Sequence, residues 1–220
     1  MPYLSPATTK TRRLRTTGRG LILPREFTDM LIEKLNWRYA TKKMDPTKVV
    51  SQKLDWWGLN YYTPMRVADD ASADAEFPAT QAASSISDVK TDIGWEVYSP
   101  ALGSLVEELY ARYELPDCYI TENGACYNMG VENGEVNDQP RLDYYADHLS
   151  VVADLLKDGY PMRGYFAWSL MDNFEWAEGY RMRFGLVHVD YDTQVRTLKK
   201  SGKWYSSLAS EFPKGNHRKP

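Results

Sequence analysis

The chain has 220 residues, 43% of them hydrophobic, so it is long enough to form one domain with a substantial core. Its formal net charge of −3 argues against general binding to nucleic acid. No apolar run approaches the length of a membrane span, and residues 1–20 lack the apolar segment of a secretory signal, so we expect neither membrane insertion nor secretion.

The first 26 residues form a basic segment. Residues 1–20 are rich in Thr and Arg and contain no acidic residue, a composition that cannot bury enough apolar surface to fold. We therefore predict a disordered basic tail over residues 1–26. A transit peptide or a nucleic-acid-binding arm fits this composition, and an artefactual segment, which we favour, fits it as well.

Residues 27–51 are predicted to be a separate helical segment, with a helix at 30–35. Residues 30–46 are similar to the opening of FMN-dependent nitroreductases, in which the position of Arg38 reaches the flavin phosphate. The alternative is that Arg38 belongs to a solvated basic face. Because the rest of a flavin site has no match, we expect no cofactor, and we place a seam near residues 50–53.

A strand is predicted over residues 54–62, where Asn60 and Tyr62 point to the same side by the two-residue period of a strand. Residues 68–90 are rich in Ala, Ser and Asp without a clear period, which predicts a loop. Trp95 follows this loop.

Two amphipathic helices follow. The first is predicted over 100–113, with Ser99 as its cap and Pro100 in its first turn, and the second over 141–158, with Gly159 as its stop. Alternating strands and helices predict parallel β/α units. The apolar faces are expected at Leu102, Leu105, Val106, Leu109 and Tyr113, and at Leu142, Tyr145, Leu149, Val152 and Leu156.

Between these helices, residues 119–121 are strand formers that lead into Glu122 and then an Asn-Gly turn signal. Barrel enzymes present catalytic groups at the ends of such parallel strands, and the alternative is a solvated loop acid. Cys118 and Cys126 flank this strand and turn, too far apart in an extended chain for a disulfide. We predict that both are reduced, as in a cytoplasmic protein.

Residues 164–168 predict another short apolar strand, followed by a loop with many aromatic and acidic residues. Trp168 and Trp176 offer flat apolar faces and Glu175 offers acceptor oxygens, which suits a sugar with a C–H face and several hydroxyls. A strand at 184–191, a helix at 203–212 and a frayed tail at 214–220 complete the prediction.

Three motifs, at residues 55–63, 121–124 and 168–176, resemble those of glycoside hydrolase family 1, the β-glucosidases, in the family's order. The resemblance covers about residues 52–213. It implies an α/β fold that is part of a (β/α)8 TIM barrel, namely strands six to eight with their helices.

The resemblance also implies a retaining hydrolase that removes terminal β-D-glucosyl residues from a β-glucoside or a related oligosaccharide, without a metal. In this family, the position of Glu122 is the nucleophile and the position of Tyr62 orients it. Residues that match the family's sugar-binding positions are Asn60, Trp95, Trp168, Glu175, Trp176 and Phe184.

One part of the family's machinery has no match. The acid/base of the family lies in an Asn-Glu-Pro motif, which does not occur in this sequence. Three strands cannot close a barrel, so we expect a complementing partner chain or a homo-oligomer to cover the strand edges. We expect weak or absent turnover by this chain. The alternatives are a non-catalytic carbohydrate-binding or interaction fragment and, least supported, a flavin enzyme.

Overall fold

The computed structural model describes residues 53–69, 79–81 and 85–211. At its centre is a sheet of three parallel strands in the order β1-β4-β5. The strands are β1 (Trp56–Tyr61), β4 (Asp117–Asn123) and β5 (Met162–Ala167). The predicted parallel β/α units are therefore confirmed, with strand ends within one residue of Tyr62, Glu122 and Trp168.

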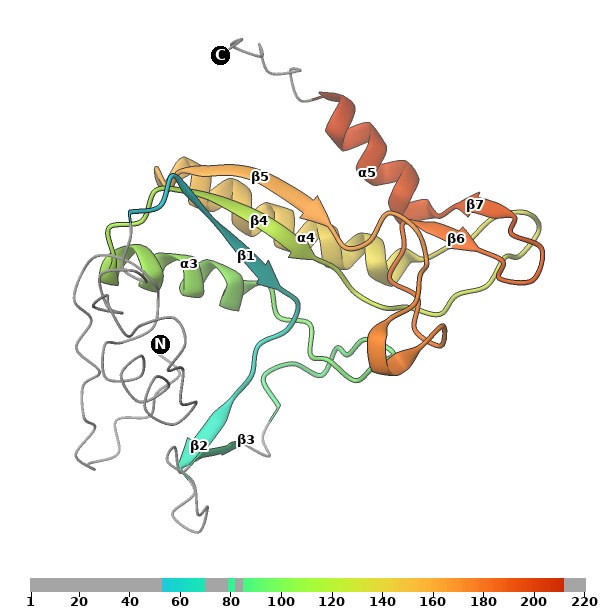
Figure 1. Ribbon diagram of the computed structural model, residues 1–220, viewed down its shortest axis with the longest axis horizontal. Coiled ribbons are helices and arrows are strands. Elements are labelled where there is room, and N and C mark those ends of the chain that lie inside the picture. Colours follow the sequence, from blue (N-terminus) through green and yellow to red (C-terminus); the bar gives the residue numbers. More distant parts are fainter. Residues whose placement is uncertain (1–52, 70–78, 82–84, 212–220) are drawn as a thin grey trace, which may run out of the picture.

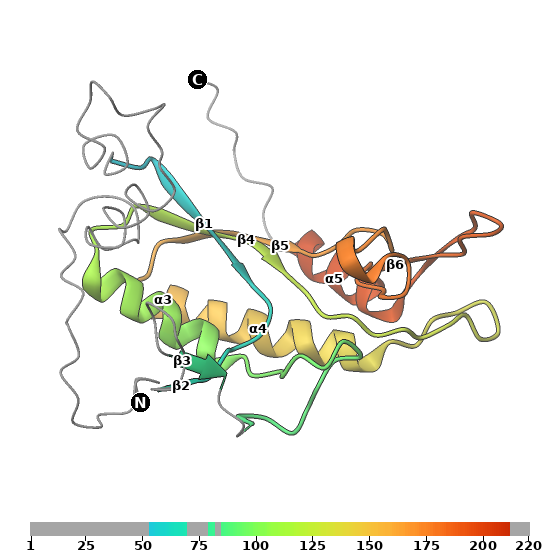
Figure 2. The ribbon, with the colours of Figure 1, turned by 60° about the horizontal axis from the view of Figure 1, so that its bottom comes forward.

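Two helices connect the strands and lie on the same face of the sheet, as Figures 1 and 2 show. They are α3 (Pro100–Arg112) and α4 (Gln139–Lys157). Pro100 occupies the first turn of α3 as expected, but Ser99 makes no side-chain capping hydrogen bond because its backbone is already helical. The predicted cap is wrong in this respect.

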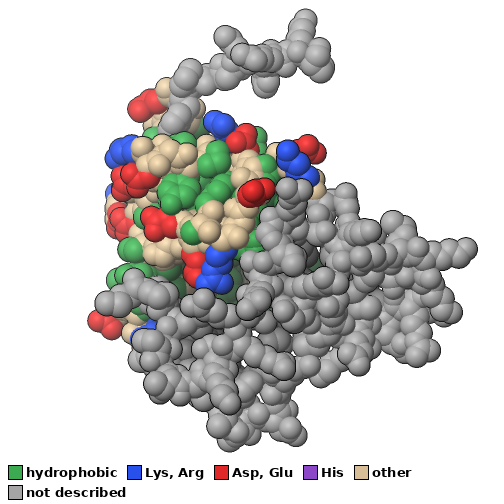
Figure 3. All heavy atoms as spheres, turned by 90° about the vertical axis from the view of Figure 1, so that its left-hand side faces the viewer, with side chains coloured by type: hydrophobic (Ala, Val, Ile, Leu, Met, Phe, Trp, Pro, Cys, Tyr) green, Lys and Arg blue, Asp and Glu red, His purple; other side chains and the backbone are tan. Residues whose placement is uncertain are grey.

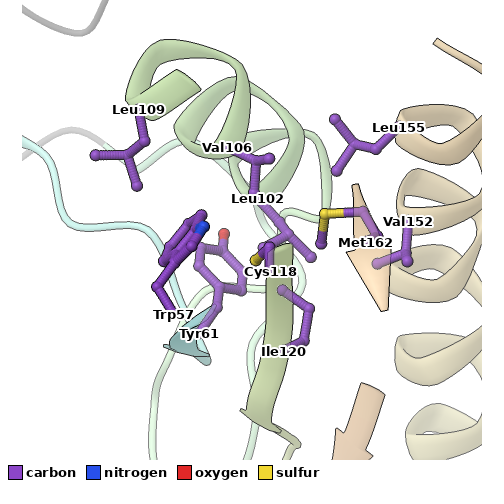
Figure 4. Packing of buried hydrophobic residues seen from close by; sticks show 10 residues of the cluster. All are labelled: Trp57, Tyr61, Leu102, Val106, Leu109, Cys118, Ile120, Val152, Leu155 and Met162. Carbon is purple, nitrogen blue, oxygen red and sulfur yellow. The ribbon is translucent and has the colours of Figure 1, made fainter. Parts of the chain in front are cut away.

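The core lies between the sheet and these helices (Figure 4). Burying this apolar surface holds α3 and α4 against the strands, since burial of apolar area is the main favourable term in folding. From the sheet it contains Trp57, Tyr61, Cys118, Ile120 and Met162, and from the helices Leu102, Val106, Leu109, Val152 and Leu155.

The buried face of α4 differs from the prediction. Leu156 is exposed, and the structure buries two positions, Arg141 and His148, that a count of apolar residues leaves out. Arg141 donates to backbone carbonyls inside the protein, which compensates for its burial, and His148 Nδ1 lies 2.7 Å from Tyr144 O, whereas His148 Nε2 has no partner among the described residues. The buried residues of α4 are Arg141, Tyr144, Tyr145, His148, Val152 and Leu155.

Short antiparallel pairs flank the central sheet. β2 (Val67–Asp69) pairs with β3 (Ala79–Gln81) inside the region predicted to be a loop. β6 (Val187–Val189) pairs with β7 (Arg196–Leu198), which was not predicted. The strand expected at 184–191 is shorter because Leu186 and Val187 donate their backbone N–H groups to Ser169 and Leu170 instead.

The remaining elements are the short helix η1 (Trp176–Glu178) and the helix α5 (Lys200–Glu211), which begins three residues earlier than predicted. Figure 3 views the end of the sheet where the strands begin. Hydrophobic side chains lie in the middle of the described part of this face, with acidic and basic side chains around them. None of the described helices is long and apolar enough to cross a membrane.

Candidate active site

The candidate site lies where the three parallel strands end. Tyr62, the first residue after β1, donates a hydrogen bond of 2.6 Å from its hydroxyl to Oε2 of Glu122 on β4. Burial and this contact with Glu122 raise the pKa of Tyr62 far above its usual value. Tyr62 therefore stays protonated and acts as a hydrogen-bond donor to the carboxylate at any physiological pH.

A second carboxylate approaches from the loop after β5. The indole Nε1 of Trp168 donates a hydrogen bond of 3.0 Å to Oε1 of Glu175. Burial raises the pKa of Glu175, and the charge of Glu122 raises it further, against the lowering effect of the Trp168 hydrogen bond. The two carboxylates are thus close enough for the charge of Glu122 to affect the protonation of Glu175.

Aromatic rings form one wall of the site. The ring centroid of Tyr62 lies 5.5 Å from that of Trp95 and 6.2 Å from that of Phe184, and Trp95 and Phe184 are 5.9 Å apart. Trp168 packs against the same cluster. The structure thus brings Tyr62, Trp95, Trp168 and Phe184 together beside the two carboxylates.

Two further sequence-predicted residues are placed differently. Asn60 lies on β1 opposite Glu122 in the strand register, and its Oδ1 accepts a hydrogen bond of 2.6 Å from Thr121 Oγ1. Trp176 begins η1, and its side chain is 84% exposed. Trp176 therefore stands away from the aromatic cluster rather than inside it.

A buried hydrogen-bond network holds the floor of the site. The amide Nδ2 of Asn123 donates to Tyr61 O at 2.7 Å and to Tyr144 Oη at 2.8 Å, while the Tyr165 hydroxyl donates to Asn123 Oδ1. Tyr144 Oη in turn donates to Tyr62 O at 2.9 Å. Asn123 thus joins all three strands and α4 directly beside Glu122.

The chain after Glu122 lies very close to the end of β5. A Cβ atom at Gly124 would lie 2.0 Å from the backbone oxygen of Trp168, so any larger residue would push these segments apart. The hydroxyl of Tyr145 donates to the same Trp168 oxygen at 3.1 Å. Glycine at this position therefore sets the distance between the segments that carry Glu122 and Trp168.

Arg141 fixes the segments behind the aromatic wall. Its buried guanidinium donates hydrogen bonds to four backbone carbonyls and contacts Asp138 at 3.3 Å. Two of these carbonyls follow Glu122 in the chain and two flank Phe184, so one side chain holds both parts of the site. The four acceptors are the oxygens of Ala125, Tyr127, Arg183 and Gly185.

Asp172 anchors the loop that carries Glu175. Its carboxylate lies 2.7 Å from Lys199 Nζ and 2.8 Å from Arg183 Nη1, and it accepts the backbone N–H of Gly185. Burial alone would raise the pKa of Asp172, but Lys199 and Arg183 together lower it below its usual value. The residue is therefore ionised and ties the loop to Lys199, the residue directly before α5.

The sequence did not single out Asn123, Tyr144, Arg141 or Asp172. Asn123 could have been identified from its position directly after Glu122, since neighbouring strand residues point to opposite faces of the sheet. Nothing in the sequence pattern shows that a helix arginine reaches four carbonyls.

In the described part of the chain, no group of three or more His, Cys, Asp or Glu residues could hold a metal ion.

Comparison with known proteins agrees with this geometry. The profile of glycosyl hydrolase family 1 matches residues 24–213. A β-glucosidase of Agrobacterium sp. is 75% identical over 192 residues, which are 87% of this chain and 42% of the relative. β-Glucosidase A of Thermotoga maritima is 38% identical over 185 residues, 83% of this chain and 40% of that protein.

Solved structures are similar as well. Virulence factor SghA from Agrobacterium tumefaciens has a TM-score of 0.78 and 78% identity over 84% of this chain and 41% of its own. The family 1 β-glucosidase of Thermotoga maritima has a TM-score of 0.73 and 37% identity over 84% of this chain and 40% of its own. SghA has also been solved in complex with its substrate analogue salicin.

The chain spans 42% and 40% of the length of the two curated relatives. The family and the similar solved structures imply a (β/α)8 TIM barrel, and the described β/α units are part of it. The family match includes residues 27–51, which lie outside the described residues, so the division at 26 and 51 and the nitroreductase likeness stay predictions. The chain belongs to glycosyl hydrolase family 1.

Proposed function

We propose that the chain carries the nucleophile side of a retaining β-glucosidase site, on the sixth to eighth strands of the family barrel. The observation that carries this proposal is the 2.6 Å hydrogen bond from Tyr62 to Glu122, next to the second carboxylate and the aromatic wall. Relatives named β-glucosidase support a β-glucoside as the substrate.

In this proposal, Glu122 attacks the anomeric carbon of the sugar. Tyr62 engages Oε2, so that Oε1 is the attacking oxygen. Because the raised pKa of Tyr62 keeps its proton in place, the hydroxyl orients the carboxylate without competing as a base. The product of this step is a covalent glycosyl-enzyme intermediate, as in other retaining glycosidases.

The other residues bind the sugar. Trp168 supports the apolar face of the ring, while the hydrogen bond between its indole and Glu175 holds the carboxylate toward the sugar's distal hydroxyls. Trp95 and Phe184 form the wall of the pocket. Asn60 contacts a hydroxyl near the reacting carbon. Trp176 is exposed in this structure, and it would have to turn toward the sugar to donate a hydrogen bond.

The acid/base must come from outside this sequence, because the Asn-Glu-Pro motif does not occur in it. General acid help is typically worth about 10²–10⁴-fold in rate, so natural glucosides suffer most. Glycosides with good leaving groups escape most of this loss in the first step. We propose that a complementing chain supplies the group, and we retain a cytoplasmic location as part of the proposal.

The alternative is a carbohydrate-binding fragment without turnover, which the missing acid/base favours. Hydrolysis of an activated aryl β-glucoside separates the two functions. We expect slow release of the aryl group by the purified chain, abolished by Glu122→Ala at unchanged circular dichroism. Binding of the glucoside without any Glu122-dependent release would establish the alternative.

A further inference from the structure

Two adjacent tyrosines of α4, Tyr144 and Tyr145, hold opposite halves of the candidate site. We propose that they are positioning residues for different steps of the reaction. Tyr144 holds Tyr62 in the place from which it orients Glu122 for attack on the sugar. Tyr145 holds Trp168 in the place from which it supports the bound sugar. The inference rests on the proposed function, because it assigns each hydroxyl to a step of that reaction.

The Tyr144 hydroxyl makes two hydrogen bonds, and both lie next to Glu122. It donates at 2.9 Å to the backbone oxygen of Tyr62 and accepts at 2.8 Å from Nδ2 of Asn123. Tyr62 donates from its own hydroxyl to Glu122, and Asn123 follows Glu122 in β4. These contacts form a closed ring that begins and ends at Glu122. The ring fixes the backbone of Tyr62 relative to β4, and with it the direction from which the Tyr62 hydroxyl meets the carboxylate.

Tyr144 is itself held in one place. Its side chain is buried, and its ring stacks on that of His148 with the centroids 4.0 Å apart and the planes 25° apart. Burial raises the pKa of Tyr144 well above its usual value, so the hydroxyl keeps the proton that it donates to Tyr62. Reacting groups are held precisely when the residues behind them are locked by packing and hydrogen bonds. Tyr144 meets this condition for Tyr62.

The Tyr145 hydroxyl serves the other side of β4. It donates at 3.1 Å to the backbone oxygen of Trp168, the first residue after β5. The indole of Trp168 in turn donates to Glu175, so Tyr145 supports the sugar platform and the second carboxylate through one residue. The rings of Tyr144 and Tyr145 are 5.8 Å apart and nearly perpendicular, at 85°, which lets the two hydroxyls reach different segments.

The topology places α4 where it can do this. Its beginning lies near the carboxyl ends of the three strands, as Figure 2 shows, and both tyrosines belong to its first half. In the sheet, β1 and β5 flank β4, which carries Glu122. Tyr144 reaches the chain after β1 and Tyr145 reaches the chain after β5. One helix therefore supports the nucleophile and the sugar platform by separate contacts.

The alternative is that both hydroxyls serve stability alone, since a buried tyrosine usually finds a hydrogen-bond partner. Tyr110 on α3 is the matched case. Its hydroxyl donates at 2.6 Å to the backbone oxygen of Pro116 and accepts at 3.1 Å from Nε1 of Trp57. Like Tyr144, it thus joins a backbone carbonyl and a side-chain N–H group, but it does so where β4 begins. A role in stability alone should make Tyr110→Phe and Tyr144→Phe behave alike.

The test is covalent labelling of the full chain by a 2-fluoroglucoside with an activated leaving group, over a range of reagent concentrations. The concentration dependence separates the dissociation constant of the reagent from the limiting rate constant of attack. Because a small displacement of a reacting group is costly, Tyr144→Phe should lower the limiting rate constant about three- to thirtyfold and leave the dissociation constant within about twofold.

Tyr145→Phe should show the reverse pattern. It should raise the dissociation constant about threefold or more and leave the limiting rate constant within about twofold, because it loosens the platform and not the nucleophile. Tyr110→Phe should leave both constants within about twofold. The proposal is wrong if Tyr110→Phe slows attack as much as Tyr144→Phe does, or if the two α4 variants change the same constant.

A double variant tests whether Tyr144 acts through Tyr62. If it does, the chain with both Tyr62→Phe and Tyr144→Phe should label at about the rate of Tyr62→Phe alone, because no oriented hydroxyl is left to disturb. Losses that multiply would show that Tyr144 acts independently of Tyr62, which contradicts the assigned role.

A measurement without any reaction separates this inference from the proposed function. In a chain with isotope-labelled tyrosine Cζ atoms, the NMR signal of Tyr62 is identified by its loss in Tyr62→Phe and reports on the hydrogen bond of its hydroxyl. We expect Tyr144→Phe to move this signal and Tyr110→Phe to leave it in place. If Tyr144→Phe does not fold by circular dichroism, His148→Leu removes the stacked ring, keeps the Tyr144 hydroxyl and should move the same signal.

The two kinds of failure then differ. A moved Tyr62 signal in a chain that is never labelled supports the positioning of Tyr62 and refutes the proposed function. Labelling of Glu122 together with an unmoved Tyr62 signal overturns this inference and leaves the proposed function in place.

Discussion

At the residue scale, the contact between Tyr62 and Glu122 decides what the site can do. Tyr62→Phe removes the 2.6 Å hydrogen bond and leaves the ring in the aromatic wall. A hydrogen bond to a charged group contributes about 1.5–3 kcal/mol, so covalent labelling of Glu122 should slow by about 10–100-fold. Rates from quenched labelling reactions measure this effect. Tyr113→Phe is a control on the far side of the molecule, and an equal loss there would refute the assigned role.

Glu175 gives the site a dependence on pH. Its pKa is raised in the folded state, first by burial and then by Glu122, so the folded protein holds this proton more tightly than the unfolded chain does. The free energy of unfolding should therefore fall as pH rises from the ordinary pKa of a glutamate carboxyl through the raised pKa of Glu175. Urea titrations of Glu175→Gln should show a shallower fall, and Glu132→Gln in an exposed turn should not.

At the scale of elements, Asn123 is the junction of the sheet. Its side chain joins β1, β5 and α4, and it is fully buried. Asn123→Ala leaves Tyr144, Tyr165 and a backbone carbonyl without this partner. Since each unsatisfied buried group costs about 1–3 kcal/mol, we expect a loss of about 2–4 kcal/mol in the free energy of unfolding. A loss below about 1 kcal/mol in urea denaturation would contradict the assigned role.

Asp172 holds the loop that carries Glu175 in place, as Asn123 holds the strands together. Asp172→Asn leaves the buried Lys199 charge without its counter-ion, which should lower the free energy of unfolding by about 3–5 kcal/mol. Because the pKa of Asp172 is lowered in the folded state, its contribution is present above the unfolded pKa and is lost as pH falls through the folded pKa. Asp192→Asn, in the exposed turn before β7, is the control, and an equal effect there would contradict this account.

The same elements show what the sequence can predict. The three strands and the helices α3 and α4 follow from apolar periodicity and turn signals, and Tyr62, Glu122, Trp168 and Glu175 lie at strand ends or just beyond. The structure brings these side chains together as the motifs led us to expect. The sugar-binding and catalytic roles of these residues remain predictions.

Other features depended on long-range contacts that a local pattern cannot show. α4 buries Arg141 because four backbone carbonyls from two distant segments surround its guanidinium. β6 is short because its neighbouring backbone groups bond to the loop after β5. The exposure of Trp176 was also not foreseen, since its position in a motif says nothing about which segments surround it.

At the scale of the whole molecule, the chain contains part of a barrel, and in the proposed function this part holds one side of a sugar site. This division predicts two different outcomes for the two chemical steps. Attack by Glu122 on a sugar with an activated leaving group needs no acid, whereas hydrolysis of the resulting intermediate needs a base that this sequence does not match. The intermediate should therefore accumulate on the chain by itself.

The most direct test is intact-mass spectrometry of the folded chain after incubation with a 2-fluoroglucoside that has an activated leaving group. We expect a single added fluoroglucosyl group, which peptide mapping assigns to Glu122, and no addition to Glu122→Gln. An unlabelled chain that circular dichroism shows to be folded, or a label on another residue, would contradict the assignment of Glu122 as the nucleophile.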